Sequence, residues 1–346
     1  MYIAALGAST PVGRDALSSA AAVRAGISGF VQHPYMVDTA GAPMRAAIAP
    51  WLDIDLQGTE RFEALLFPAI DQALESVAGD AGAKLQIGLA LGLPSARPGL
   101  PSDIGKTVRA AIAKRYPNRF VAQAILECGH AAGLLGIHAT LRKMAAGAFE
   151  ACIVAGVESY LAPETLEWLE ANDQLHSAGP LNNAWGFIPG EAAAAALLVT
   201  ERVLPRLGLN PLGRVVGVGQ GFEENRIKTE TVCIGEGLTT AFREALSALP
   251  PDAKVTDVYC DMNGEPYRAD EFGFAALRTK EAFESASDFI APADCWGDVS
   301  AASGPLGLLL STMAARKAYA KGPLTFVWAS SETGERGAAV LAAERQ

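Results

Sequence analysis

The chain has 346 residues, half of them apolar, and a formal net charge of -10. This length and apolar content can bury a large core in one or two domains of ordinary size. The acidic balance and the scattered Lys and Arg provide no basic stripe for phosphate backbones, so we expect neither nucleic acid nor an anionic membrane as a partner.

The opening segment and the cysteines bear on the compartment. The first residues lack a basic stretch ahead of an apolar one, and no apolar run approaches about 18 residues, so we expect no signal peptide and no membrane span. The five cysteines are widely spaced and form no CxxC pair that would suggest zinc or a disulfide framework. We therefore expect a cytoplasmic protein in which most cysteines are small buried side chains.

The first part of the chain alternates short runs rich in Val and Ile with alanine-rich helical stretches. The patterns predict a strand at 2–6, a helix at 15–25, a strand at 85–93, helices at 103–114 and 131–146, and a strand at 151–156. The apolar run from Cys152 to Ala155 does not alternate with polar residues. This strand should therefore lie in a sheet that helices cover on both faces.

The second part repeats the alternation, which is typical of a layered α/β fold. We expect a strand at 213–218, a helix at 239–249, a strand at 255–261, a long helix at 300–318, and strands at 324–329 and 338–343. We predict two similar halves, residues 1–205 and 206–346, joined near the segment 204–211. Because ligands of such folds bind where strand ends of the halves meet, the functional site should lie at that junction.

Four ordered stretches of small and glycine residues carry a family resemblance. They are 5–13 followed by 25–29, 138–147 followed by 155–159, the Gly-Glu-Ala signature at 185–193, and the turn at 297–304. In order and spacing they resemble the motifs of the β-ketoacyl synthase family, within the thiolase-like superfamily. The resemblance spans the chain and implies a five-layered αβαβα fold of two duplicated halves, with a dimer formed along a strand at 120–126.

The resemblance also assigns the positions that carry the chemistry. In active members a cysteine at a helix N-terminus is acylated, and two histidines assist decarboxylation of the extender. The cysteine position falls on His130, and the histidine positions fall on Asn263 and Asp298. The family's lysine falls on Ala293, and its C-terminal oxyanion loop falls on 333–338. The scaffold motifs are retained while every chemical position is changed.

Our leading interpretation is a non-condensing homologue of fatty acid or polyketide type. An acyl-imidazole on His130 would be too labile to hold an acyl chain as the family's cysteine does. The chain would then be a pseudoenzyme, an acyl-binding or partner subunit comparable to chain-length factors. It would form a homodimer, or a heterodimer with an active ketosynthase, and acyl carrier protein or acyl-CoA would be further partners.

In two other interpretations the protein is an enzyme. His130 with Asn263 and Asp298 offers a base, an amide donor and a carboxylate for hydrolysis or acyl transfer on thioesters, although a polar cluster that satisfies itself explains them equally well. A condensing enzyme with Cys128 as its nucleophile is the third interpretation. The spacing to His138 argues instead that Cys128 is a buried thiol.

The remaining polar motifs receive structural interpretations. Glu191 is expected to be a buried structural carboxylate, and His138 a packed helix residue. The acidic stretch 261–271 has no EF-hand pattern, so we expect a solvated loop and no metal. The glycines near Gly7 and Gly217 form no GxGxxG between a strand and a helix, so we expect no organic cofactor.

Overall fold

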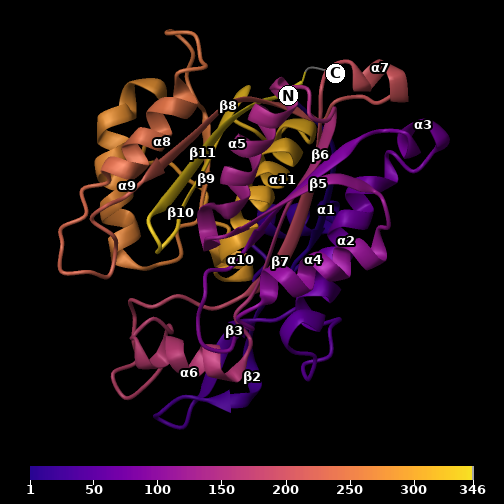
Figure 1. Ribbon diagram of the computed structural model, residues 1–346. Coiled ribbons are helices and arrows are strands. Elements are labelled where there is room, and N and C mark those ends of the chain that lie inside the picture. The colour runs from indigo at the N-terminus through magenta and orange to yellow at the C-terminus, as the bar shows by residue number, and fades with distance from the viewer. Residues whose placement is uncertain (345–346) are drawn as a thin grey trace.

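The computed structural model describes residues 1–344 (Figure 1). The first part of the chain contains β1 (Tyr2–Ser9), α1 (Ala16–Arg24), β2 (Phe30–Val37), β3 (Pro43–Ala47), α2 (Gly58–Glu75), α3 (Asp80–Ala83), β4 (Ile87–Leu93), α4 (Ile104–Arg115), β5 (Phe120–Glu127), α5 (Ala132–Ala145), β6 (Ala151–Ser159), α6 (Pro163–Ala171), β7 (Glu191–Val199) and α7 (Val203–Leu207). The second part contains β8 (Gly213–Phe222), α8 (Glu236–Leu246), β9 (Asp257–Cys260), α9 (Pro266–Thr279), α10 (Ala293–Trp296), α11 (Ser303–Arg316), β10 (Leu324–Ser330) and β11 (Glu335–Ala342).

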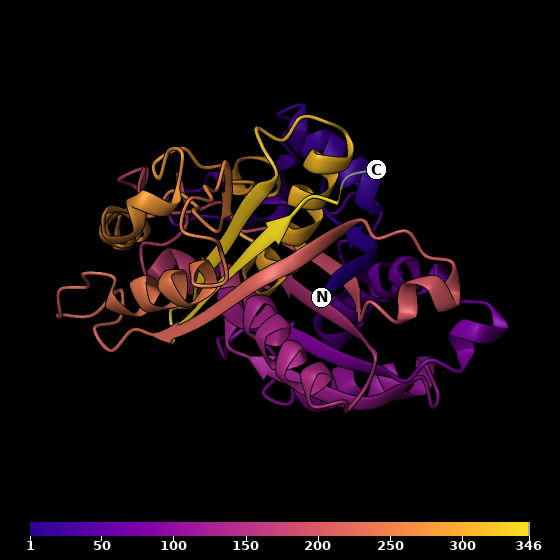
Figure 2. The ribbon, with the colours of Figure 1, turned by 90° about the horizontal axis from the view of Figure 1, so that it is seen from above.

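The main sheet consists of two parts that meet along one short contact. Its strand order is β5-β4-β6-β7-β1-β8-β11-β10-β9, and β1 pairs with β8 only at Tyr2–Arg214 and Ile3–Gly213. From above, β8 crosses the molecule between the yellow strands β10 and β11 and the purple part of the chain (Figure 2). Outward from the contact, β1-β7-β6-β4 and β8-β11-β10-β9 have matching pairings, antiparallel twice and then parallel.

The buried side chains define five layers. One core packs α2 and α4 against one face of the first sheet, and another packs α8 and α9 against the outer face of the second sheet. The largest core lies between the sheets and is filled by α5 and α11. Figure 1 shows α8 and α9 on the opposite side of the molecule from α2 and α4. The order αβαβα confirms the predicted fold class.

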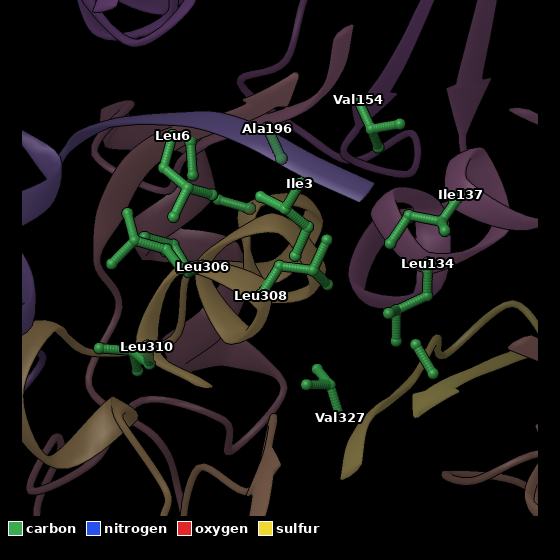
Figure 3. Close-up of a cluster of buried hydrophobic side chains, with 14 of the residues drawn as sticks. Ile3, Leu6, Leu134, Ile137, Val154, Ala196, Leu306, Leu308, Leu310 and Val327 are labelled. Atoms are coloured by element: carbon green, nitrogen blue, oxygen red, sulfur yellow. The ribbon is translucent and has the colours of Figure 1, made fainter. Parts of the chain in front are cut away.

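The two central helices pack closely because small residues face each other. Leu134 and Ile137 of α5 and Leu306 of α11 point into the same core (Figure 3). A Cβ on Gly133 would lie 2.3 Å from the Cδ of Pro305, so only glycine permits this contact between α5 and α11. The N-terminal turns of both helices are thereby held side by side, which matters for the site.

Most predicted elements match the structure within a few residues. The exception is the acidic stretch 261–271, for which we expected a solvated loop. Its second part is the first turns of α9, and Asp261, Glu265 and Glu271 are buried.

The boundary between residues 205 and 206 stays a prediction. Within residues 1–344, no helix combines the length and the apolar content needed to span a bilayer.

Candidate active site

His130, Asn263 and Asp298 come from three separate turns. His130 lies in the 3-10 turn Gly129–Ala131 that follows β5 and leads into α5. Asn263 lies between β9 and α9, and Asp298 lies between α10 and the turn that opens α11. Residues from both predicted halves thus meet at the N-terminal ends of the central helices.

Glycines hold the Asp298 turn against the Gly-Glu-Ala signature. The backbone N–H of Asp298 donates to the carbonyl of Ile188 at 2.8 Å, and the N–H of Gly190 donates to the carbonyl of Asp298 at 2.9 Å. A Cβ on Gly190 would lie 2.2 Å from the carbonyl oxygen of Trp296. The signature is therefore required for the backbone that positions Asp298, independently of any chemistry.

The three side chains are joined by short hydrogen bonds. His130 Nε2 lies 2.9 Å from each carboxylate oxygen of Asp298. Asn263 Nδ2 donates to Asp298 Oδ2 at 2.6 Å, and the N–H of Ser300 donates to Oδ1 at 2.8 Å. His130 and Asp298 are each 4% exposed, so this pair is almost removed from water.

The contacts decide the ionisation of Asp298. Burial alone would raise its pKa, but the charge and hydrogen bond of His130, with Arg268 and Asn263, outweigh burial and hold the pKa well below its usual range. An ionised carboxylate beside Nε2 requires that Nε2 carry the proton, since two lone pairs would otherwise face each other. Nδ1 is then the ring nitrogen left for other partners, and no residue among 1–344 forms a hydrogen bond with it.

Arg268 of α9 is the residue at this site that the sequence patterns did not single out. Its Nη2 lies 3.1 Å from His130 Nε2, and its Nη1 donates to Asp261 Oδ2 at 3.0 Å. Its Nε lies 3.5 Å from Glu265 Oε2. An arginine three residues after a glutamate at the start of a helix was the available signal. We call His130, Asp298, Asn263 and Arg268 the His130 cluster.

The carboxylates of Glu265 and Glu332 beside the His130 cluster already have cation or amide partners. Asn263 Nδ2 also donates to Glu265 Oε2 at 2.9 Å, and Lys228 Nζ lies 3.2 Å from Glu265 Oε1 and 2.6 Å from Glu332 Oε1. Burial would raise the pKa of Glu332, but Lys228, helped by Arg268 and His130, lowers it. Because these oxygens already have partners, the cluster is not arranged as a cation site.

The His130 cluster separates two cavities. One, of about 250 Å³, is bordered by His130, Ser300 and other groups, namely Ser95, Ala96, Arg97, Gly129, Tyr160, Trp168, Leu169, Gln174, Phe187, Arg226, Glu332 and Thr333. The other, of about 200 Å³, is bordered by Asn263 and Asp298 together with Phe30, His176, Ala184, Gly186, Ile188, Gly264, Ala293 and Asp294. The larger cavity is lined by both aromatic and hydroxyl-bearing residues and is somewhat smaller than most drug-sized pockets, which begin at about 300 Å³.

Two features of the larger cavity escaped the sequence patterns. Ser300 has φ of +34°, a strained value for a residue with a side chain. Arg97 pairs with Glu158 at 2.5 Å and lies over the ring of Tyr160 at 4.2 Å. Burial, with the charges of Asp298 and Glu158, raises the pKa of Tyr160, so its hydroxyl stays a neutral donor.

Cys128 does not border either cavity. It precedes the turn of His130 and is half-buried. Burial and the charge of Glu335 raise the pKa of its thiol to about 12. A nucleophilic cysteine needs the opposite shift, because the thiolate is the reactive form.

Glu191 forms a closed ion pair on the other side of the sheet. Arg61 Nε and Nη2 donate to its two oxygens at 2.6 and 2.8 Å. The N–H of Ala49 and the hydroxyl of Ser159 donate to it at 2.8 and 3.0 Å. These contacts are those of a packed structural carboxylate.

His138, in α5, lies 3.4 Å from Glu244 Oε1.

Comparison with known proteins supports the fold. Residues 124–203 match the family model described as Beta-ketoacyl synthase, N-terminal domain, and a search of curated proteins finds no match. The ketosynthase from module 6 of the bacillaene synthase of Bacillus subtilis 168 has a TM-score of 0.80 at 14% identity, covering 100% of this chain and 72% of that chain.

Two further solved structures cover both chains almost completely. A ketosynthase in complex with its type II polyketide acyl-carrier protein and bound to the hexaketide has a TM-score of 0.81 at 13% identity, with 99% of each chain covered. The ishigamide ketosynthase/chain length factor has a TM-score of 0.70 at 20% identity, again with 99% of each chain covered. These likenesses confirm the predicted thiolase-like fold.

Proposed function

We propose that this chain, which resembles the β-ketoacyl synthases in its whole fold and in the sequence of residues 124–203, is a non-condensing subunit that binds an acyl thioester and pairs with a second ketosynthase-type chain. The observation that carries the proposal is the His130 cluster. Three of its side chains, His130, Asn263 and Asp298, are those that the sequence resemblance assigns to the family's cysteine and histidine positions. They are hydrogen-bonded to one another beside an open cavity.

The cavity favours binding of a polar carbonyl group with a short apolar chain. Its lining includes the hydroxyl-bearing residues Ser95, Ser300 and Thr333 and the aromatic residues Trp168 and Phe187. A thioester needs donors for its oxygen and apolar contacts for its chain. No cysteine borders the cavity among the described residues, so the acyl group has no thiol to move to.

Pairing is supported by the edge of the sheet. β5 is an end strand of the main sheet, and its Val121 is 53% exposed. An unpaired edge strand of this length presents a row of free backbone groups that a second chain can cover. One of the similar structures is a ketosynthase/chain length factor, and another is a ketosynthase with its acyl-carrier protein. These titles motivate a ketosynthase-type chain and a carrier protein as the partners to test.

The acyl-binding part is tested with wild type, Cys128→Ser and His130→Ala. Each protein is incubated with short-chain acyl-CoA, and binding, free thiol release and intact mass are measured. The proposal expects saturable binding with no thiol release and no mass adduct. Turnover or an adduct contradicts the non-condensing subunit, and the variant that loses it identifies the responsible side chain.

The pairing part has its own test. We expect the purified chain to form a dimer, alone or after mixing with a ketosynthase, in light scattering coupled to size exclusion. Val121→Glu should weaken this dimer, whereas Leu181→Glu, at a side chain that is 94% exposed, should leave it intact. A wild-type chain that stays monomeric alone and with ketosynthases would sink this part.

A second candidate function is hydrolysis of the thioester, favoured by the His130–Asp298 pair. In the neutral form of His130, with Nε2–H donating to Asp298, Nδ1 would accept a proton from water as the water oxygen bonds to the thioester carbon. The C–S bond then breaks and the leaving thiolate takes up the proton, while Asp298 stabilises the imidazolium. Thiol release by wild type and Cys128→Ser but not by His130→Ala would establish this candidate.

A further inference from the structure

Several polar groups that border the larger cavity have no partner in the protein. Ser300 and Tyr160 border this cavity and are 2% and 6% exposed. Neither hydroxyl forms a hydrogen bond within residues 1–344, and both oxygens remain accessible, whereas the unpartnered Nε of Arg97 is fully enclosed. His130 Nδ1 is also without a partner in this part of the chain. Buried polar groups that are left unpaired are costly, so these groups indicate a polar ligand.

Two of these groups can donate a hydrogen bond to the ligand. The ring of Tyr160 is held between the guanidinium of Arg97, 4.2 Å from its centroid, and the ring of Phe187, 5.5 Å away. Burial raises the pKa of Tyr160, so its hydroxyl keeps its proton. Ser300 Oγ lies beside the turn of His130, because a Cβ on Gly129 would be 3.4 Å from it. The oxygen of a thioester can accept from either hydroxyl.

Two other groups of the cavity can only accept. Glu332 borders the cavity, and its Oε1 is held by Lys228 Nζ at 2.6 Å and by Gln174 Nε2 at 3.4 Å, whereas its Oε2 forms no hydrogen bond with any described residue. Burial would raise the pKa of Glu332, but the charge of Lys228 lowers it, so the carboxylate is ionised. Nδ1 of His130 is an acceptor in the neutral imidazole. Neither a thioester group nor an alkyl chain has a donor for these two atoms.

We propose that the cavity is specific for short acyl thioesters that carry a hydroxyl group on the chain, an inference that rests on the acyl-binding function proposed above. The hydroxyl donates to Glu332 Oε2 or to His130 Nδ1, while the thioester oxygen accepts from Tyr160 or Ser300. A ketone at the same position offers lone pairs alone and places them against a carboxylate. A site whose polar groups match a hydroxyl rejects the analogue without it, because those groups are then left unpaired.

The test compares three ligands that differ only at the third carbon of a four-carbon chain. These are 3-hydroxybutyryl-CoA, acetoacetyl-CoA and butyryl-CoA, and their binding to the full chain is measured by titration calorimetry. The coenzyme A part is common to all three, so differences in affinity report the cavity. We expect the hydroxylated thioester to bind the wild type at least about tenfold more tightly than either of the others.

Glu332→Gln tests the residue that we assign to the hydroxyl. Its amide can donate to a ketone as well as accept from a hydroxyl, so the ratio of the two affinities should fall toward one. Cys128→Ser is the matched control and should keep the wild-type ratio, because Cys128 does not border the cavity. A ratio that is the same in Glu332→Gln as in wild type would overturn the assignment.

The wild-type series stands without any variant and separates this inference from the function on which it rests. Equal affinities for the three thioesters would overturn the specificity for a hydroxyl and leave acyl binding in place. Tighter binding of acetoacetyl-CoA would overturn it as well. If none of the three thioesters binds, the acyl-binding function fails, and the specificity fails with it.

Discussion

Two buried polar clusters of this molecule, both containing family-motif positions, differ in what surrounds them. The Glu191 carboxylate accepts hydrogen bonds from Arg61, Ala49 and Ser159, and Arg61 and Ser159 border a space of only about 20 Å³. That is room for about one water molecule. The His130 cluster instead separates cavities of about 250 and 200 Å³.

The difference contrasts a carboxylate whose contacts are all made by packed neighbours with a cluster that borders open space. Glu191 retains the family's identity, and its contacts require no substrate. His130, Asn263 and Asp298, which the sequence resemblance assigns to the family's catalytic positions, border open space. A cluster that only satisfied itself would be expected to close that space, because protein interiors pack densely. Substitutions in and around both clusters test this contrast, and their expected effects range from a large loss of stability to almost none.

A substitution at the buried Arg61–Glu191 pair should cause the largest loss of stability. Arg61→Ala leaves Glu191 buried and without its cation, so we expect the free energy of unfolding to fall by about 3–5 kcal/mol. Urea denaturation at pH 7 measures the change. Lys321→Ala removes one partner of the exposed pair with Asp288 and should cost at most about 1 kcal/mol. Similar losses for both variants would mean that the Arg61–Glu191 pair is solvated.

Asp298→Asn should have the next largest effect, and it should depend on pH. The pKa of Asp298 is lower in the folded than in the unfolded chain, so its charge stabilises the fold above about pH 4 and this stabilisation is lost as the pH falls further. We expect a loss of about 2–4 kcal/mol at pH 7, because His130 loses the carboxylate that it contacts, whereas Arg268 keeps Asp261 and Glu265.

The difference in the free energy of unfolding between wild type and Asp298→Asn should be smaller when urea denaturation is repeated at pH 3. Asp288→Asn, at an exposed carboxylate, controls for general effects of acid. A difference that is constant from pH 7 to pH 3 would show that Asp298 is not held ionised by its neighbours.

How much of the structure the sequence could predict depends on how far apart along the chain the interacting residues lie. The helix at 131–146 and the strand at 151–156 depend on neighbouring residues, and both lie within a few residues of the prediction. The family motifs assigned His130, Asn263 and Asp298, but they carried no information on the bonds between them. Those bonds join residues that are 168 and 35 positions apart.

The acidic stretch 261–271 shows what local patterns miss. We expected a solvated loop for Asp261, Glu265 and Glu271 because their spacing forms no EF-hand pattern. Arg268, which lies within the same stretch, pairs with Asp261 and Glu265. In the structure, Arg336, which lies 65 residues further along the chain, donates a hydrogen bond to the Glu271 carboxylate. Burial of such charges is decided by tertiary contacts, which composition does not report.

His130→Ala should be less destabilising than Asp298→Asn. Asp298 keeps hydrogen bonds from Asn263 Nδ2 and from the N–H of Ser300 when the imidazole is removed. Water can also enter from the larger cavity. We expect a loss of about 1–2 kcal/mol at pH 7. Because His130 is the group that lowers the pKa of Asp298 the most, the further loss of stability below about pH 4 should be smaller in His130→Ala than in wild type and should end at a higher pH.

The same urea series at pH 7 and pH 3 measures the effect of His130→Ala. His130→Gln, which can keep a donor for Asp298, should fall between Ala and wild type. A loss as large as that of Asp298→Asn would mean that His130 is a closed structural contact, and the contrast between the two clusters would fail.

Cys128→Ser should have the smallest effect on stability and on acyl-thioester binding. Cys128 borders neither cavity, and its pKa of about 12 leaves it a neutral thiol at pH 7. We expect a change in stability within about 0.5 kcal/mol, and acyl-thioester binding equal to that of wild type. If Cys128→Ser instead abolished binding, the ligand would have to lie outside the cavity of His130, and the open cluster would be as structural as the closed one.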